Sequence, residues 1–201
     1  SMMDVWTPMY GDQKLLDEQY DVIAGAWPQN KNEVVLVVDE RNNITDLTMY
    51  GLGLRDANEI SAAFEKIMKG EKLESQADSF TYEELMNLQF RLLLNTYIYE
   101  YDENLGCWAD RAKNDEYMAE KIENGLPIHI SGIVREKAGV TQGALMRGTI
   151  CYTQELVDYL IENNSKSEIV KAQLAVDVAV SAAKVKKWKY SDLEDYKNKT
   201  L

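Results

Sequence analysis

The sequence predicts an α+β fold with short strands and about four to five capped helices. Three observations lead to this class. They are an apolar run too short for a helix, several helix starts with capping residues, and an order of elements that is mixed. A strict alternation of strands and helices would instead favour a doubly wound parallel sheet.

The most informative stretch is an apolar run, Val34-Val35-Leu36-Val37-Val38, which follows a turn-forming segment. Before the run, Gly25 permits a positive φ, and Pro28 pushes Trp27 towards an extended backbone. The run is apolar on both faces and too short to be a helix. The sequence therefore predicts a strand that is covered on both sides.

Capping residues mark the helix starts. Asp56-Ala57-Asn58-Glu59 and Thr81-Tyr82-Glu83-Glu84 have the spacing of a capping box, in which two residues satisfy each other's backbone N–H groups. Asn114 and Thr153 open two further helices. We expect the helix after Thr153 to end at Asn163-Asn164, with one buried stripe formed by Leu156, Val157, Leu160 and Ile161.

Alternating apolar residues predict strands over 127–134, with a bulge at Gly132, and over 149–152. For 168–174 a strand is one interpretation. The Ala- and Val-rich segment 175–187 is compatible with a strand or a helix, so no course is predicted for 175–201.

The composition restricts the function. A chain of 201 residues suits one domain, or one domain with an inserted lobe. Its 22 basic and 34 acidic side chains give a net charge of −12, which disfavours nucleic acid and anionic membrane surfaces. The chain lacks the run of about 18 apolar residues that a membrane span needs. Cys107 and Cys151 are compatible with a disulfide or with two free thiols.

No residue pattern selects a catalytic, cofactor-binding or metal-binding residue. The lone histidine, His129, lies in a predicted strand without ligands at metal spacing, and we expect it to face solvent. Asp102-Glu103-Asn104-Leu105-Gly106 resembles a calcium loop, but it lacks the required ligand pattern and is better interpreted as a hairpin turn.

The feature with the most functional interest is aromatic. Tyr97, Tyr99 and Tyr101 alternate, so their rings should share one strand face, with Trp108 across the hairpin. Such a ladder suits a contact with a sugar or a partner protein. The favoured alternative is that the rings only pack under a helix or stabilise the hairpin.

Several segments together resemble the extracellular domain of FtsX-like (MacB-like) ABC transporter permeases of Gram-positive gut Firmicutes. In the first half they are Leu15-Leu16-Asp17-Glu18-Gln19-Tyr20-Asp21-Val22-Ile23-Ala24-Gly25-Ala26-Trp27-Pro28, Asn32-Glu33-Val34-Val35-Leu36-Val37, the stretch from Ile44-Thr45-Asp46 through Leu52-Gly53-Leu54, and Ser79-Phe80-Thr81-Tyr82-Glu83-Glu84-Leu85. In the second half they are Gly125-Leu126-Pro127-Ile128-His129-Ile130-Ser131-Gly132-Ile133-Val134-Arg135, Gly148-Thr149-Ile150-Cys151-Tyr152-Thr153-Gln154-Glu155-Leu156 and Ile169-Val170-Lys171-Ala172-Gln173.

The resemblance covers roughly residues 15 to 174 in a consistent order. It implies that 1–201 is one extracellular domain of a longer permease. It also implies a mixed α/β lobe with a smaller inserted lobe at about 56–125. The family pattern is not found after Val178, where Ala179-Val180-Ser181-Ala182-Ala183 stands.

The same resemblance implies a function. The domain would lie on the extracellular face of the cell membrane, belong to a permease with a cytoplasmic ATPase partner, and work as one of two permease copies. It would relay ATP-driven movement and recognise a protein, peptide or lipoprotein client, without catalysis and without a cofactor.

Two other classes remain open on the residues alone. One is a secreted carbohydrate-binding or adhesion module that uses Tyr97, Tyr99 and Tyr101. The other is a small hydrolase with a pair of carboxylates, for which no pair is selected by the sequence.

Overall fold

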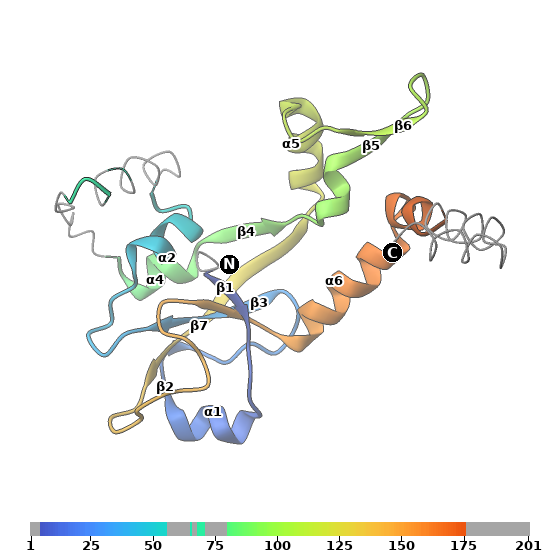
Figure 1. Ribbon diagram of the computed structural model, residues 1–201. Coiled ribbons are helices and arrows are strands. Elements are labelled where there is room, and N and C mark those ends of the chain that lie inside the picture. The colour runs from blue at the N-terminus through green and yellow to red at the C-terminus, as the bar shows by residue number, and fades with distance from the viewer. Residues whose placement is uncertain (1–4, 56–64, 66–67, 71–79, 176–201) are drawn as a thin grey trace, which may run out of the picture. The chain divides into compact units, whose positions relative to one another are not determined.

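The computed structural model describes residues 5–55, 65, 68–70 and 80–175 (Figure 1). They fall into two units. The first contains the described residues up to Leu92 together with Ile122–Tyr159, and the second contains Leu93–Lys121 together with the described residues from Leu160. The mixture of helices with a mixed sheet confirms the predicted α+β class.

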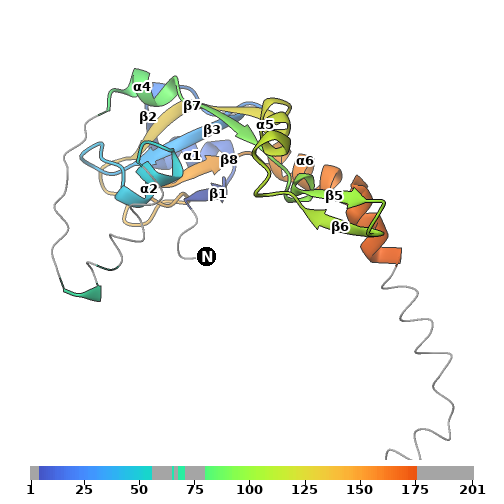
Figure 2. The ribbon, with the colours of Figure 1, turned by 90° about the horizontal axis from the view of Figure 1, so that it is seen from above.

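A six-stranded sheet forms the first unit (Figure 2). Its main path has the order β1-β8-β3-β7-β2, and β4 also pairs with β7. The β1/β8 and β3/β7 pairs are parallel, and the remaining pairs are antiparallel. The strands are β1 (Trp6–Pro8), β2 (Tyr20–Gly25), β3 (Glu33–Val38), β4 (Gln89–Leu92), β7 (Leu126–Glu136) and β8 (Ile150–Tyr152).

The strand predicted from the apolar run is β3, and it lies between β7 and β8. Every residue of the run is at most 1% exposed. A strand with neighbours at both edges and cover on both faces has no side left for water, which explains why its side chains do not alternate with polar ones. The prediction is confirmed.

The bulge predicted at Gly132 is present, but it lies one residue earlier, at Ser131. Opposite β3, Val34 pairs with Ile130 and Val35 with Gly132, so Ser131 is the extra residue of β7. A Cβ atom at Gly132 would lie 2.2 Å from the Ala26 carbonyl oxygen, so only glycine fits at this crossing.

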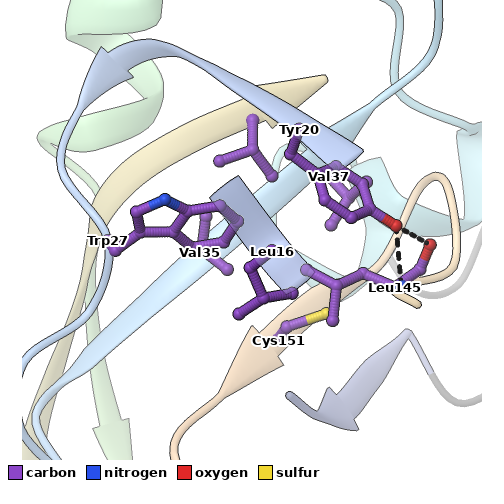
Figure 3. Close-up of a cluster of buried hydrophobic side chains, with 8 residues drawn as sticks. Leu16, Tyr20, Trp27, Val35, Val37, Leu145 and Cys151 are labelled. Carbon is purple, nitrogen blue, oxygen red and sulfur yellow. Dashed lines mark hydrogen bonds between the residues drawn. The ribbon is translucent and has the colours of Figure 1, made fainter. Parts of the chain in front are cut away.

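One face of the sheet carries an apolar cluster (Figure 3). Its members come from β2, β3, β7, β8, the short helix α1 (Gln13–Gln19), the segment between β2 and β3, and the loop before β8. The cluster consists of Leu16, Tyr20, Trp27, Val35, Val37, Val134, Leu145 and Cys151. Tyr20 and Trp27 meet edge to face with ring centroids 6.2 Å apart.

The strand residues that alternate with those of the cluster point to the other face of the sheet. On β1 and β4 these include Trp6 and Phe90, whose rings meet edge to face at 5.4 Å. Helices α2 (Asp46–Gly51) and α4 (Tyr82–Met86) supply the buried side chains Met49 and Leu85.

The second unit contains the 3₁₀ helix η1 (Asn95–Ile98) and a two-stranded sheet of β5 (Tyr99–Asp102) and β6 (Cys107–Asp110). Helix α5 (Asp115–Glu123) follows β6, and helix α6 (Gln154–Lys166) follows β8.

Three of the predicted helix starts are confirmed. Thr81 and Glu84 form the capping box of α4. Asn114 accepts a hydrogen bond from the Tyr117 N–H at 3.0 Å, and Thr153 accepts one from the Leu156 N–H at 3.2 Å. The predicted capping box at Asp56 lies outside the described residues.

The prediction for α6 was wrong in its end and in its stripe. The helix runs past Asn163 to Lys166, because asparagine costs little in a helix interior and Glu162 pairs with Lys166 one turn on. Only Leu156 of the stripe is buried, and Ile161 is 64% exposed.

Residues 168–175 are helical, so the interpretation of 168–174 as a strand was also wrong. Lys171, Ala172 and Gln173 are strong helix formers, and this local preference prevails here. The expected inserted lobe at 56–125 begins outside the described residues and stays a prediction. Residues 176–201, for which no course was predicted, also lie outside the described residues.

Candidate functional site

The aromatic hairpin, defined here as η1, β5 and β6, is the site that the sequence analysis singled out. The hairpin is confirmed, with Tyr101 directly opposite Trp108 and Tyr99 opposite Asp110. The Tyr101 and Trp108 rings meet at 5.5 Å and 68°, an edge-to-face contact.

The prediction of a three-tyrosine ladder was wrong at Tyr97. This residue lies in η1, where its N–H donates to the Leu94 carbonyl in a tight 3₁₀ turn. The alternation of a strand begins only at Tyr99, so Tyr99 and Tyr101 share one strand face and Tyr97 does not belong to it.

The hairpin is held by contacts within its own unit. The Tyr117 hydroxyl of α5 lies 3.0 Å from the Tyr97 carbonyl oxygen and 3.4 Å from that of Tyr99. Arg111 donates to Glu100 at 2.9 Å and lies 3.9 Å from the Asp102 carboxylate. These contacts fix the direction of β5 beside α5.

The hairpin turn is confirmed as well. Asp102 accepts hydrogen bonds from the Asn104 and Leu105 N–H groups at 3.0 and 3.1 Å, which is the role of an aspartate in a polar turn. Among the described residues, no group of three or more metal-binding side chains gathers at one point.

Part of the aromatic surface is open to solvent. Tyr97 is 38% exposed and Tyr101 is 50% exposed, whereas Tyr99 and Trp108 are half-buried. Tyrosine offers a large contact area with few rotatable bonds, so this surface suits the recognition of another molecule.

His129 and the two cysteines take separate places. His129 is half-buried on β7 between the buried Ile128 and Ile130, so the expectation of a solvent-facing ring holds only in part. Both cysteines are free: Cys107 is exposed and Cys151 is fully buried. Burial raises the pKa of the Cys151 thiol and keeps it protonated.

A second feature, which the sequence analysis missed, is a charged hollow at the carboxyl ends of the parallel strands β3 and β7. Its volume is about 440 Å³. The charged residues that line it are Asp21, Glu40, Arg135, Glu136, Lys137 and Arg147. They lie far apart in sequence, so no local pattern could have identified the group.

Glu136 and Arg147 form the fixed part of this hollow. Glu136 is 8% exposed. Its carboxylate accepts a hydrogen bond from the Gly143 N–H at 3.0 Å and pairs with the Arg147 guanidinium. This pairing raises the pKa of Arg147, which also lies 3.3 Å from Glu40. Both oxygens of Glu136 are therefore used to hold the loop between β7 and β8.

In comparisons with known proteins, no family model matches this chain, and no curated protein or solved structure matches it. Within the described ranges, no helix is both long enough and apolar enough to cross a membrane.

Proposed function

We propose that this chain is the extracellular domain of an FtsX-like permease, in which it relays movement and recognises a client without performing chemistry. The proposal starts from the resemblance of residues 15 to 174 to that family. In such a permease, a cytoplasmic ATPase drives the membrane helices and the domain passes the displacement to a bound protein, peptide or lipoprotein.

One observation carries the proposal: segments of the resemblance that lie far apart in sequence meet in the sheet. The Ala26 N–H donates to the Ser131 carbonyl at 2.9 Å, and the Ser131 hydroxyl lies 3.2 Å from the Ala26 carbonyl oxygen. Glycine at 132 is required by the same approach. The resembling segments therefore depend on one another physically.

A relay also needs rigid connections between its elements, and the loop between β7 and β8 forms one. The Tyr20 hydroxyl donates to the Leu145 carbonyl at 2.9 Å and accepts from the Leu145 N–H at 2.7 Å (Figure 3). The Ala144 N–H donates to the Gln19 side chain at 2.8 Å. Well-packed, fully hydrogen-bonded elements transmit displacement with little internal deformation.

The aromatic hairpin is the surface that we assign to the client, because its exposed tyrosines can make a large contact. The same exposure keeps a second candidate open, a secreted carbohydrate-binding or adhesion module that stacks sugars on Tyr97 and Tyr101.

The gene itself provides the first experiment. Sequencing the DNA around this coding segment should show one hydropathic span before it, three after it, and a neighbouring ATPase gene. Expression of both genes should then give a complex that co-purifies in detergent. A free-standing secreted protein without a neighbouring ATPase would overturn the proposal.

The client surface needs a separate test. Replacing Tyr97, Tyr99 and Tyr101 together by serine should leave the chain folded and abolish capture of the client by the complete permease. Tyr10→Ser is the matched control, because Tyr10 is 64% exposed and belongs to the other unit. Glycan-array binding of the isolated chain that is lost in the triple variant would favour the carbohydrate-binding module instead.

A further inference from the structure

The charged hollow contains two opposite charges that are neighbours in the sheet and do not pair. Asp21 on β2 lies directly opposite Arg135 on β7 in the antiparallel register. Side chains in such positions are close enough to form an ion pair. Arg135 instead donates from Nη1 to the Asn42 side chain at 2.8 Å, and no described residue bonds to the Asp21 carboxylate.

The other charges of the hollow divide into satisfied and uncompensated ones. Arg147 pairs with Glu136 and also lies 3.3 Å from Glu40, so these three side chains are engaged with one another. Lys137 donates to the neutral carbonyl of Asp17 at 2.6 Å, so no acid compensates its charge at that contact. One negative charge, on Asp21, and two positive charges, on Arg135 and Lys137, are left to face a ligand.

We propose that this hollow binds a small zwitterion, a free α-amino acid. The planar guanidinium of Arg135 matches a carboxylate, with Lys137 as a second cation, and the Asp21 carboxylate matches an ammonium group. The volume of about 440 Å³ lies in the range of small-molecule sites. The carboxyl ends of parallel strands are a common place for such sites.

The balance of charges selects a zwitterion over a simple ion. Three acidic and three basic side chains line the hollow. A simple anion would meet the Asp21 carboxylate as well as the cations, and a simple cation would meet Arg135 and Lys137. A ligand that carries both charges a few atoms apart satisfies both sets at once. This site is independent of the transporter function proposed above.

The test is a titration of the 201-residue chain, labelled with ¹⁵N, with a panel of free L-α-amino acids. Members of the panel should shift the amide signals of Asp21, Arg135 and Lys137. For the best binder, the N-acetylated form and the amide form each keep one charge, and each should bind at least tenfold more weakly. Tenfold corresponds to one good charged contact, about 1.4 kcal/mol.

Two variants test which side chain binds the ammonium group of the ligand and which binds its carboxylate. Asp21→Asn should weaken binding of the amino acid about tenfold and leave binding of its N-acetylated form unchanged. Arg135→Gln should weaken binding of the amino acid by a similar factor and leave binding of its amide form unchanged. The matched controls are Asp158→Asn and Arg91→Gln, whose side chains lie outside the hollow and should bind like the native chain.

Three results would overturn the proposal. The signals of the hollow could stay unmoved by every amino acid at tens of millimolar, acetate could bind as well as the amino acids, or both variants could bind like the native chain. The amide spectra of the variants show directly whether each one is folded, so a loss of binding cannot be confused with unfolding.

Discussion

At the scale of single residues, the Tyr20 hydroxyl has the most clearly defined structural role, which is to hold the loop at Leu145. It is buried, and it serves both backbone groups of Leu145 at once. Burial raises the pKa of Tyr20, so the hydroxyl keeps the proton that it donates to the Leu145 carbonyl. A local sequence pattern could not reveal this contact, because the partners are 125 residues apart.

The substitution Tyr20→Phe should lower the free energy of unfolding by about 1–3 kcal/mol, because it leaves a buried N–H and a buried C=O without a partner. Urea denaturation followed by tryptophan fluorescence measures the change. Tyr10→Phe, at an exposed tyrosine, is the control and should change stability by less than about 0.5 kcal/mol. Equal effects of the two substitutions would show that the hydroxyl contact is not formed.

At the scale of elements, caps and apolar runs were the most predictable features. Thr81, Asn114 and Thr153 each act within three residues of their partners, so the sequence alone contains the interaction. The end of α6 was not predictable in this way. Asparagine is accepted both inside a helix and at its end, and the Glu162–Lys166 pair favours continuation.

In the aromatic hairpin, too, some features were predictable from the sequence and others were not. The turn residues and the Tyr101–Trp108 pair were predictable because alternation and spacing encode them. The 3₁₀ turn at Tyr97 was not, since the alternation of tyrosines continues through it unchanged. The charged hollow was wholly unpredictable, because Asp21 and Arg135 become neighbours only through the register of β2 and β7.

A two-stranded sheet is marginal by itself, so the Tyr101–Trp108 contact should contribute measurably to the hairpin. A double-mutant cycle with Tyr101→Ala and Trp108→Ala should give a coupling of about 0.5–1.5 kcal/mol. Hydrogen exchange of the β5 and β6 amides measures it locally. Leu105→Ala at the exposed tip is the control, and its cycle with Tyr101→Ala should give a coupling near zero. A similar coupling in both cycles would contradict the contact.

At the scale of the whole molecule, the sequence predicted the fold class correctly because it follows from the order of elements. The sheet order did not follow, since β8 enters between β1 and β3 through pairing over more than a hundred residues. Long-range pairing of this kind is decided by how the apolar faces fit together rather than by local preference.

The two thiols report on the integrity of the molecule. Cys107 is exposed and Cys151 is buried, so in the native chain a thiol reagent such as DTNB should react quickly with one thiol and slowly with the other. In urea both thiols should react at a similarly fast rate, because unfolding exposes Cys151 and removes the burial that raises the pKa of its thiol. Cys107→Ser is the control and should abolish only the fast phase. A chain in which neither thiol reacts in urea would contain a disulfide.

The short strand β1 limits how the sheet can grow. The Val5 carbonyl and the Met9 N–H bond to β8, so by alternation the peptide groups of Trp6 and Pro8 point away from it. Proline has no N–H to offer there. Another polypeptide that paired with this edge of β1 would find only the Trp6 N–H as a donor over Trp6–Pro8, which discourages β-type aggregation through it.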